Sequence, residues 1–257
     1  MKLVKVFAVV AGVGLAGFLV HAIREAKEAA AASSCEGRLN WLQAALRQYE
    51  AANGHLPPAY VLGPDGKPWH SWRVLLLPYL EEGEVYAKYR FDEPWNGPNN
   101  SRLADQIDVN AFQCPSGRDY DKTLNTNYLA VVGEGTAFPG DKPARLADFR
   151  DGLENTLLLA EVADAGIHWM EPRDLRLESI AVGRSTADVP AISSPHWRDP
   201  IVVFADRITA YRLSQPLGSA SLHALATIAG GETTTRAALL APDGGSRLSE
   251  KWDGGSK

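Results

Sequence analysis

Residues 23–52 read IREAKEAAAASSCEGRLNWLQAALRQYEAA, and this stretch decides how the rest of the chain can be arranged. It contains no proline and a single glycine, and strong helix formers fill it. Its large apolar residues recur at helical spacing and so share one face: Leu39, Leu42, Leu46 and Tyr49. The pattern predicts one long helix whose second half packs on a globular core.

The helix has a predicted end, and it continues upstream without a break. Asn53-Gly54 is a C-terminal stop signal, and Pro57-Pro58 prevents the helix from resuming. Upstream, residues 6–20 read VFAVVAGVGLAGFLV and carry no charge. We therefore expect a single helix from the N-terminus to Asn53.

The apolar N-terminal run favours a transmembrane anchor over residues 1–23. Through Ile23 the run has about 20 residues, the length that spans a bilayer. Lys2 and Lys5 would stay cytoplasmic, which predicts a single-pass inner-membrane protein with its exported domain, residues 24–240, outside the cytoplasm. A signal peptide cleaved after Ala22 is the alternative.

Composition indicates a globular protein and limits its partners. The 257 residues are 45% hydrophobic and 22% charged, with a net charge of -5 and no basic run. Nucleic acid is therefore not expected as a partner, because phosphate binding needs clustered Lys and Arg. The Gly-rich, charged tail, residues 241–257, is predicted to be disordered.

The chain has two cysteines, Cys35 and Cys114. They make no CxxC metal pair. In an oxidising compartment a disulfide between them would staple the long helix to the domain, and the alternative is two separate buried thiols. The residues leave both alternatives open.

The stretch PHWRDPIVVFADRITAYRL, residues 195–213, predicts two paired strands. From Ile201 to Ala205 every residue is apolar, so both faces of a strand formed here would be apolar. This is typical of a strand buried on both faces. A hairpin turn at Asp206-Arg207 would return the chain as the partner strand ITAYRL. Other short strand-like pieces upstream predict an α+β fold.

Catalytic and metal motifs are sparse. The chain has no G-x-S-x-G elbow, and its six histidines show neither H-x3-H nor HExxH spacing. His196 and Asp206 with a distant serine form the basis of a hydrolase alternative, which requires the His and Asp side chains to converge. We expect no catalysis, no metal and no cofactor.

Two further clusters have a functional and a structural interpretation. Asp92, Glu93 and Trp95 lie in an oxygen-rich stretch that could bind calcium, but a rigid surface turn is favoured because EF-hand spacing is absent. Five tryptophans in predicted loops support an alternative function, binding of envelope polysaccharide, if they are exposed together: Trp69, Trp72, Trp95, Trp169 and Trp197.

The order of short motifs resembles the bacterial domain of unknown function 1559 family of prepilin-like exported proteins. The motifs that carry the resemblance over residues 22–232 are IREAKEAAAASSC, LNWLQAALRQY, NGHLPPAY, SWRVLLLPYLEE, DEPWN, CPS, TNYLAVVGEGTAFPG, DGLENT and a His followed after nine residues by Asp. The resemblance implies a pilin-like fold, a long N-terminal helix packed on an antiparallel sheet with loop insertions. It implies no activity, because none is established for the family.

Two departures from the family pattern stand out. No prepilin processing site with its glutamate is present in residues 1–20, and Arg207 replaces the glycine after Asp206. We expect a divergent, membrane-anchored, pseudopilin-like structural or interaction protein of the cell envelope, with protein partners or self-assembly. His196, Asp206, Arg207, Asp92, Glu93 and Trp95 are then structural motif residues.

Overall fold

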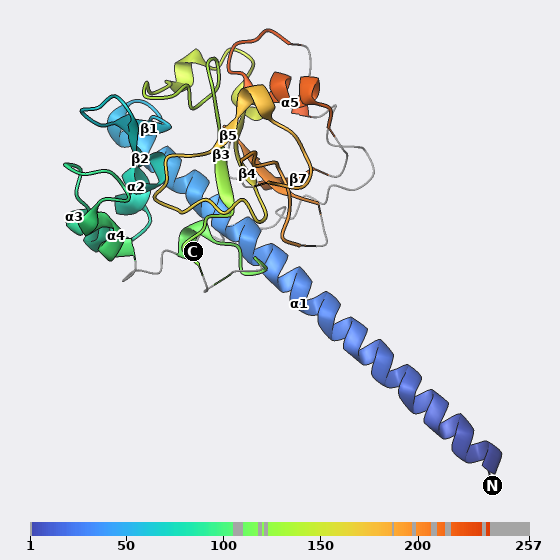
Figure 1. Ribbon diagram of the computed structural model, residues 1–257. Coiled ribbons are helices and arrows are strands. Elements are labelled where there is room, and N and C mark those ends of the chain that lie inside the picture. The colour runs from blue at the N-terminus through green and yellow to red at the C-terminus, as the bar shows by residue number, and fades with distance from the viewer. Residues whose placement is uncertain are drawn as a thin grey trace, which may run out of the picture.

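The computed structural model describes residues 2–104, 110–117, 120, 123–186, 188–196, 199–206, 210–213, 217–232 and 235–236, with the backbone alone for residues 2–16. The protein is a mixed α+β structure in which a long N-terminal helix crosses a body built on a five-stranded sheet (Figure 1). The helices are α1 (Lys2–Asn53), α2 (Trp72–Leu76), α3 (Gly83–Lys88), α4 (Pro98–Ala104) and α5 (Ser219–Ala226). The strands are β1 (Tyr60–Leu62), β2 (Pro68–Ser71), β3 (Tyr128–Val132), β4 (Leu157–Glu161), β5 (Leu175–Arg176), β6 (Ile201–Phe204) and β7 (Ala210–Arg212).

The predicted long helix is confirmed. α1 ends at Asn53, where Gly54 takes a φ of 77° and its N–H donates to the Glu50 carbonyl at 2.7 Å. This left-handed glycine just past the last turn is a common helix terminator. The predicted apolar face lies against the sheet, with Leu39, Leu42 and Leu46 fully buried.

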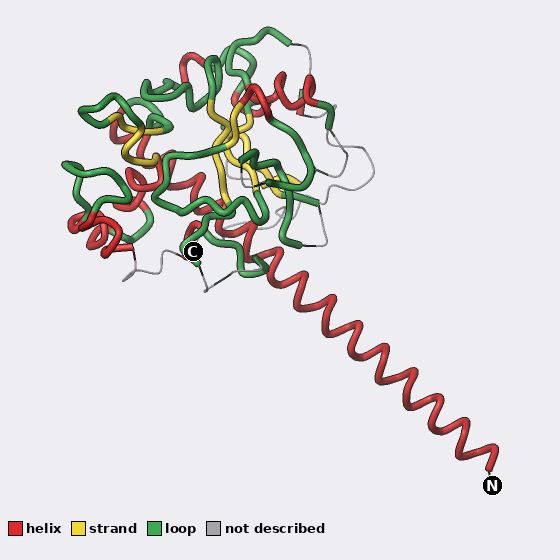
Figure 2. Tube along the Cα trace, viewed as in Figure 1, coloured by secondary structure: helices red, strands yellow, loops and turns green. Residues whose placement is uncertain are grey.

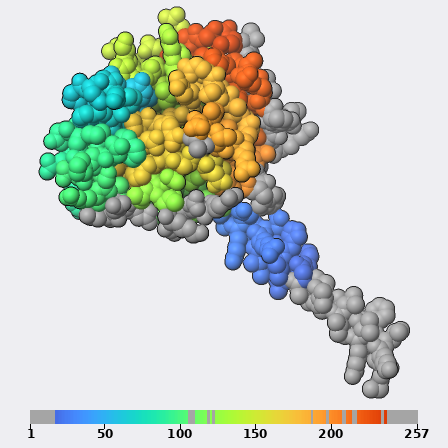
Figure 3. All heavy atoms as spheres, in the orientation of Figure 1, coloured from blue at the N-terminus to red at the C-terminus, as the bar shows by residue number. Residues whose placement is uncertain are grey.

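The N-terminal half of α1 projects away from the body (Figure 1 and Figure 3). The sequence predicted a transmembrane anchor at residues 1–23 and a single-pass inner-membrane location, and this prediction is wrong. Within the described part of the chain, no helix combines the length and the apolar character needed to cross a membrane. From Gly17 on, where the side chains are described, α1 soon reaches a charged segment, which shortens the apolar part of the described helix: Arg24, Glu25, Lys27 and Glu28.

The central sheet has the strand order β5-β3-β4-β6-β7 (Figure 2 shows its strands in yellow). Neighbouring strands run antiparallel except β5, which pairs with β3 in parallel. The expected antiparallel sheet is therefore correct for four strands. The two-residue strand β5 departs from it because it enters the sheet from a long loop rather than a hairpin.

Both faces of the sheet are buried, as the alternation in β6 predicted. Ile201 and Val203 belong to the core on the α1 side, while Val202 and Phe204 belong to the core on the α5 side. The predicted return strand is present as β7, in which Tyr211 pairs with Val202. The predictions for Arg207, Trp197 and residues 241–257 fall outside the described residues.

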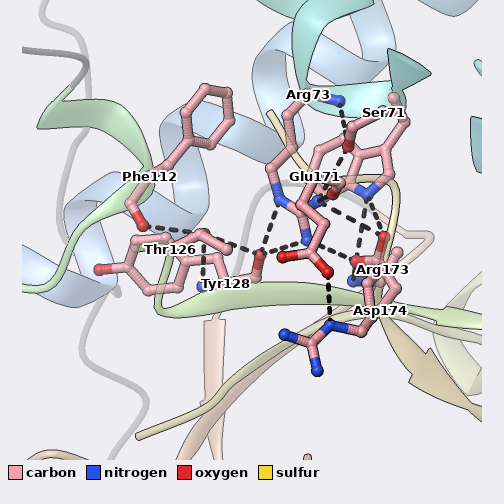
Figure 4. A network of polar contacts seen from close by, with 10 residues as sticks. Ser71, Arg73, Phe112, Thr126, Tyr128, Glu171, Arg173 and Asp174 are labelled. Atoms are coloured by element: carbon pink, nitrogen blue, oxygen red, sulfur yellow. Dashed lines mark hydrogen bonds and ion pairs between the residues drawn. The ribbon is translucent and has the colours of Figure 1, made fainter. Parts of the chain in front are cut away.

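A buried ion pair joins α2 to the centre of the sheet (Figure 4). Arg73 Nη2 lies 2.5 Å from Asp174 Oδ1, and both side chains are almost fully excluded from solvent. The same guanidinium donates to the Tyr128 carbonyl of β3 at 3.2 Å. Asp174 also accepts from the Trp72 indole at 3.2 Å and from the Ala130 N–H at 2.8 Å. Burial raises the pKa of Asp174 to about 6, against the opposing effect of Arg73.

We predict that Arg73→Met lowers the free energy of unfolding at pH 7 by about 3–5 kcal/mol, because it leaves the Asp174 carboxylate buried without its cation. Urea denaturation followed by circular dichroism measures the change. Arg176→Met is the matched control: Arg176 pairs with Glu178 at 3.7 Å on the surface, where the cost should stay below about 1 kcal/mol. Equal effects of the two substitutions would contradict the role given to the buried pair.

Candidate functional site

The structure gathers five side chains where α1 leaves the body, which we call the His196 cluster: Glu28, Cys35, Cys114, Glu161 and His196. Glu28 and Cys35 lie two turns apart on one face of α1. Glu161 is the last residue of β4, and His196 lies in the loop before β6. Four separate segments of the chain therefore meet at one point.

A disulfide lies at the centre of the cluster. Cys35 and Cys114 are bonded, with their Cα atoms 5.2 Å apart, and both are fully buried. The Asn127 amide oxygen accepts from the Cys114 N–H at 2.8 Å and fixes the loop that carries this cysteine. Of the two alternatives that the sequence left open, the disulfide is the one present.

The His196 imidazole lies between two carboxylates and the disulfide. Its Nε2 is 3.2 Å from Cys114 Sγ and 3.5 Å from Glu161 Oε1. Its Nδ1 is 3.4 Å from Glu28 Oε2. The ring itself is excluded from solvent, so both nitrogen atoms depend on these partners.

The local chain orients both carboxylates toward the ring. Glu161 Oε2 accepts from the Ile201 N–H at 3.2 Å, whereas its buried Oε1 faces no donor among the described residues other than the imidazole at 3.5 Å. Glu28 Oε2 accepts from the Ser116 hydroxyl at 3.2 Å. Each carboxylate therefore has one fixed contact to the protein and also faces the imidazole.

The charges favour a protonated imidazole. Burial alone lowers the pKa of His196, but hydrogen bonding to Glu161, the charge of Glu161 and then Glu28 raise it more, so the net pKa lies above the ordinary value. A protonated ring donates from both nitrogen atoms and can bond both carboxylates at once. The cluster therefore ties α1 to β4 and to the loop before β6.

The structure does not bring His196 and Asp206 together as the hydrolase alternative requires. Asp206 forms an ion pair with Arg236, and its backbone carbonyl accepts from the Gln43 amide of α1 at 3.1 Å. Among the described residues, no serine or threonine hydroxyl is bonded to the His196 ring. His196 and Asp206 therefore take part in two separate contacts with α1, His196 with Glu28 and Asp206 with Gln43.

The oxygen-rich stretch forms turns that lead into α4. Glu93 Oε1 accepts from the N–H groups of Asn99 and Asn100 at 2.7 and 2.6 Å, where α4 begins. Asp92 is exposed, and the Trp95 ring is half-buried with its centroid 5.2 Å from that of His168. These contacts use Glu93 as a helix cap, a role that the sequence pattern did not predict when it favoured a rigid surface turn over a calcium loop.

The tryptophans of the polysaccharide alternative differ in their exposure. Trp72 and Trp169 lie in the core with at most 2% exposure, and Trp69 and Trp95 are half-buried. Trp197 lies outside the described residues. Two of the five rings therefore face the core and are not available to a ligand from solvent.

Sequence reasoning missed Glu28, Glu161 and the Arg73–Asp174 pair. Glu161 has a local signal, since a carboxylate ends the otherwise apolar strand LLLAE. Glu28 precedes Cys35 by two helical turns, which also hints at a shared face. Neither signal identifies the partner, because 168 residues separate Glu28 from His196.

We predict that the stabilising contribution of His196 to the fold is largest at the acidic end of the range from pH 5.5 to 9. Because its folded pKa is raised, its contribution is complete below the unfolded pKa of about 6.5 and is lost as the pH rises through the folded pKa. Urea denaturation at pH 5.5 to 9 should show the largest cost of His196→Asn at the acidic end. In a Glu28→Gln/Glu161→Gln background this pH dependence should vanish, and its persistence would refute the pairing.

One comparison with known proteins gives a result. The family model described as "Protein of unknown function (DUF1559)" matches residues 24–215, which include all five members of the His196 cluster. No curated protein and no solved structure matches. The match spans about three quarters of the chain and agrees with the order of motifs in the sequence. The chain therefore belongs to the DUF1559 family.

Proposed function

We propose that this protein is a pilin-like structural subunit that associates with other helices, including those of its own copies, through the projecting half of α1. The observation that carries the proposal is a group of large apolar side chains exposed on that half: Phe18 at 73%, Leu19 at 58%, Val20 at 50% and Ile23 at 46%. Apolar groups gathered on a surface in this way are typical of an interaction site.

The distribution of these side chains indicates the kind of partner. At 100° per residue, Phe18, Leu19 and Val20 point in three different directions around α1. A helix that is apolar around its circumference is covered best when helices pack on several sides. A bundle of α1 helices from several subunits meets this requirement, as in a pilin-like assembly.

The body half of α1 gives the projecting half a fixed base. Its apolar face is buried on the sheet, and the His196 cluster fastens it where it emerges. The whole helix is about 78 Å long at 1.5 Å per residue. Because one continuous helix joins the two halves, packing of the N-terminal halves in a bundle would also determine where each body lies.

The His196 cluster supports a structural rather than a catalytic role. Both cysteines are bonded to each other, and His196 is paired with carboxylates instead of a hydroxyl nucleophile among the described residues. A disulfide of this kind persists in an oxidising environment. The proposed function therefore needs no reaction at this site.

Sedimentation velocity of the full chain over a hundredfold range of concentration tests the proposal. We expect oligomers for the natural sequence and monomers for Leu19→Glu/Ile23→Glu, because charges in the apolar segment oppose helix packing. Ala26→Glu/Ala30→Glu is the matched control: it adds the same charge at exposed positions of α1 closer to the body and should still assemble. A natural protein that remains monomeric throughout would contradict the proposal.

A further inference from the structure

We propose that reduction of the Cys35–Cys114 disulfide turns the His196 cluster into a binding site for a zinc-like divalent transition-metal ion. The ligands are the two cysteine thiolates, His196 Nε2 and Glu161 Oε1. This inference is independent of the proposed assembly function, because it concerns the body half of the molecule and a different redox state.

The ligand atoms already lie close enough together. Cys35 Sγ, Cys114 Sγ, one nitrogen atom of His196 and one carboxylate oxygen of Glu161 lie within 4.8 Å of one another, and all four residues are buried. Around a tetrahedral zinc ion, with bonds of about 2.0–2.3 Å, neighbouring ligand atoms stand roughly 3.3–3.8 Å apart. The sulfur atoms must separate from bonding distance, and ligand atoms at the 4.8 Å limit must approach each other by roughly 1–1.5 Å.

Two observations point to a ligand independently of the cysteines. Glu161 is fully buried, and within the described part of the chain the imidazole of His196 is the one donor that its Oε1 faces, whereas its other oxygen accepts a backbone N–H. A buried carboxylate oxygen with so few partners can take a metal ion in place of the imidazole proton. This oxygen and Cys114 Sγ face the same His196 nitrogen atom, at 3.5 and 3.2 Å.

The second observation is the position of Glu28. Its Oε2 lies 3.4 Å from His196 Nδ1, the nitrogen atom on the far side of the ring from the sulfur. Metal-binding histidines commonly donate their second N–H to a carboxylate, which fixes the tautomer and aims the other nitrogen atom at the metal. Glu28, held by Ser116, stands in that position.

The chemistry balances with a dithiol reductant. Thiol–disulfide exchange transfers two electrons and two protons from the dithiol to the Cys35–Cys114 bond, which breaks into two thiols while the reductant becomes a disulfide. The divalent ion then displaces both thiol protons and the proton on His196 Nε2, and all three protons pass to solvent. Thiolate and imidazole together favour zinc, and cobalt(II) can serve as its spectroscopic substitute.

A surface groove of about 460 Å³ lies beside the cluster, lined by Arg24, Glu25, Lys27, Glu28, Ala31 and Ser116. Glu28 and Ser116 belong both to this groove and to the contacts around His196. Displacement of the Glu28 side chain would open a route from solvent to the sulfur atoms. The metal would keep α1 fastened to the body when the disulfide is absent.

The test uses the full chain without a polyhistidine tag, reduced with a phosphine in the absence of oxygen and titrated with Co²⁺. We expect one ion per chain, a thiolate-to-cobalt charge-transfer band, tetrahedral d–d bands and displacement by Zn²⁺. The oxidised protein should show none of these. His196→Ala and Glu161→Gln should each weaken binding at least tenfold, and Glu28→Gln about 10–100-fold.

His223→Ala is the control, since this exposed histidine on α5 lies outside the cluster and its loss should leave binding unchanged. If the reduced chain unfolds, Zn²⁺ should restore its circular dichroism spectrum in the natural sequence and not in His196→Ala. A reduced chain that neither binds Co²⁺ nor regains structure with Zn²⁺ would overturn the proposal. Binding that is equally strong in His196→Ala and Glu161→Gln would overturn it as well.

Discussion

The bond between Cys35 and Cys114 closes a loop across 79 residues of sequence at the point where α1 leaves the body. Chain-entropy arguments assign a loop of this size roughly 4 kcal/mol of stabilisation. The contact between Glu28 and His196 lies two turns upstream of this bond, so α1 is attached to the body at two points along its length. This double attachment gives the projecting half of the helix a fixed direction, on which the proposed association depends.

Buried polar groups specify how the parts of the body fit. The Arg73–Asp174 pair fixes α2 against β3, and the His196 cluster fixes α1 against β4. Such groups add little net stability when paired, but a different packing would leave them unpaired at a cost of several kcal/mol, about 3–5 for an ion pair. Glu161 Oε1, which faces the His196 imidazole alone in the part of the chain that the structure describes, lies at the cluster where we infer a second, metal-bound state.

Local patterns predicted the elements that depend on neighbouring residues. The helix up to Asn53, the stop at Gly54 and the two-sided burial of β6 follow from periodicity and turn chemistry. The parallel pairing of β5 and the contact of His196 with Glu28 could not be predicted, because they join segments distant in sequence. The membrane prediction was wrong because the described part of α1 reaches the charged residues after Ile23 too soon to form a membrane span.

The claim that the His196 cluster holds α1 where it emerges is tested most directly by hydrogen exchange with mass spectrometry. The account predicts that His196→Ala raises the exchange rate of backbone amides at least tenfold in residues 28–39. Residues 42–50, packed through Leu42 and Leu46, should keep their protection in the same variant. Unchanged exchange in residues 28–39 would contradict the account.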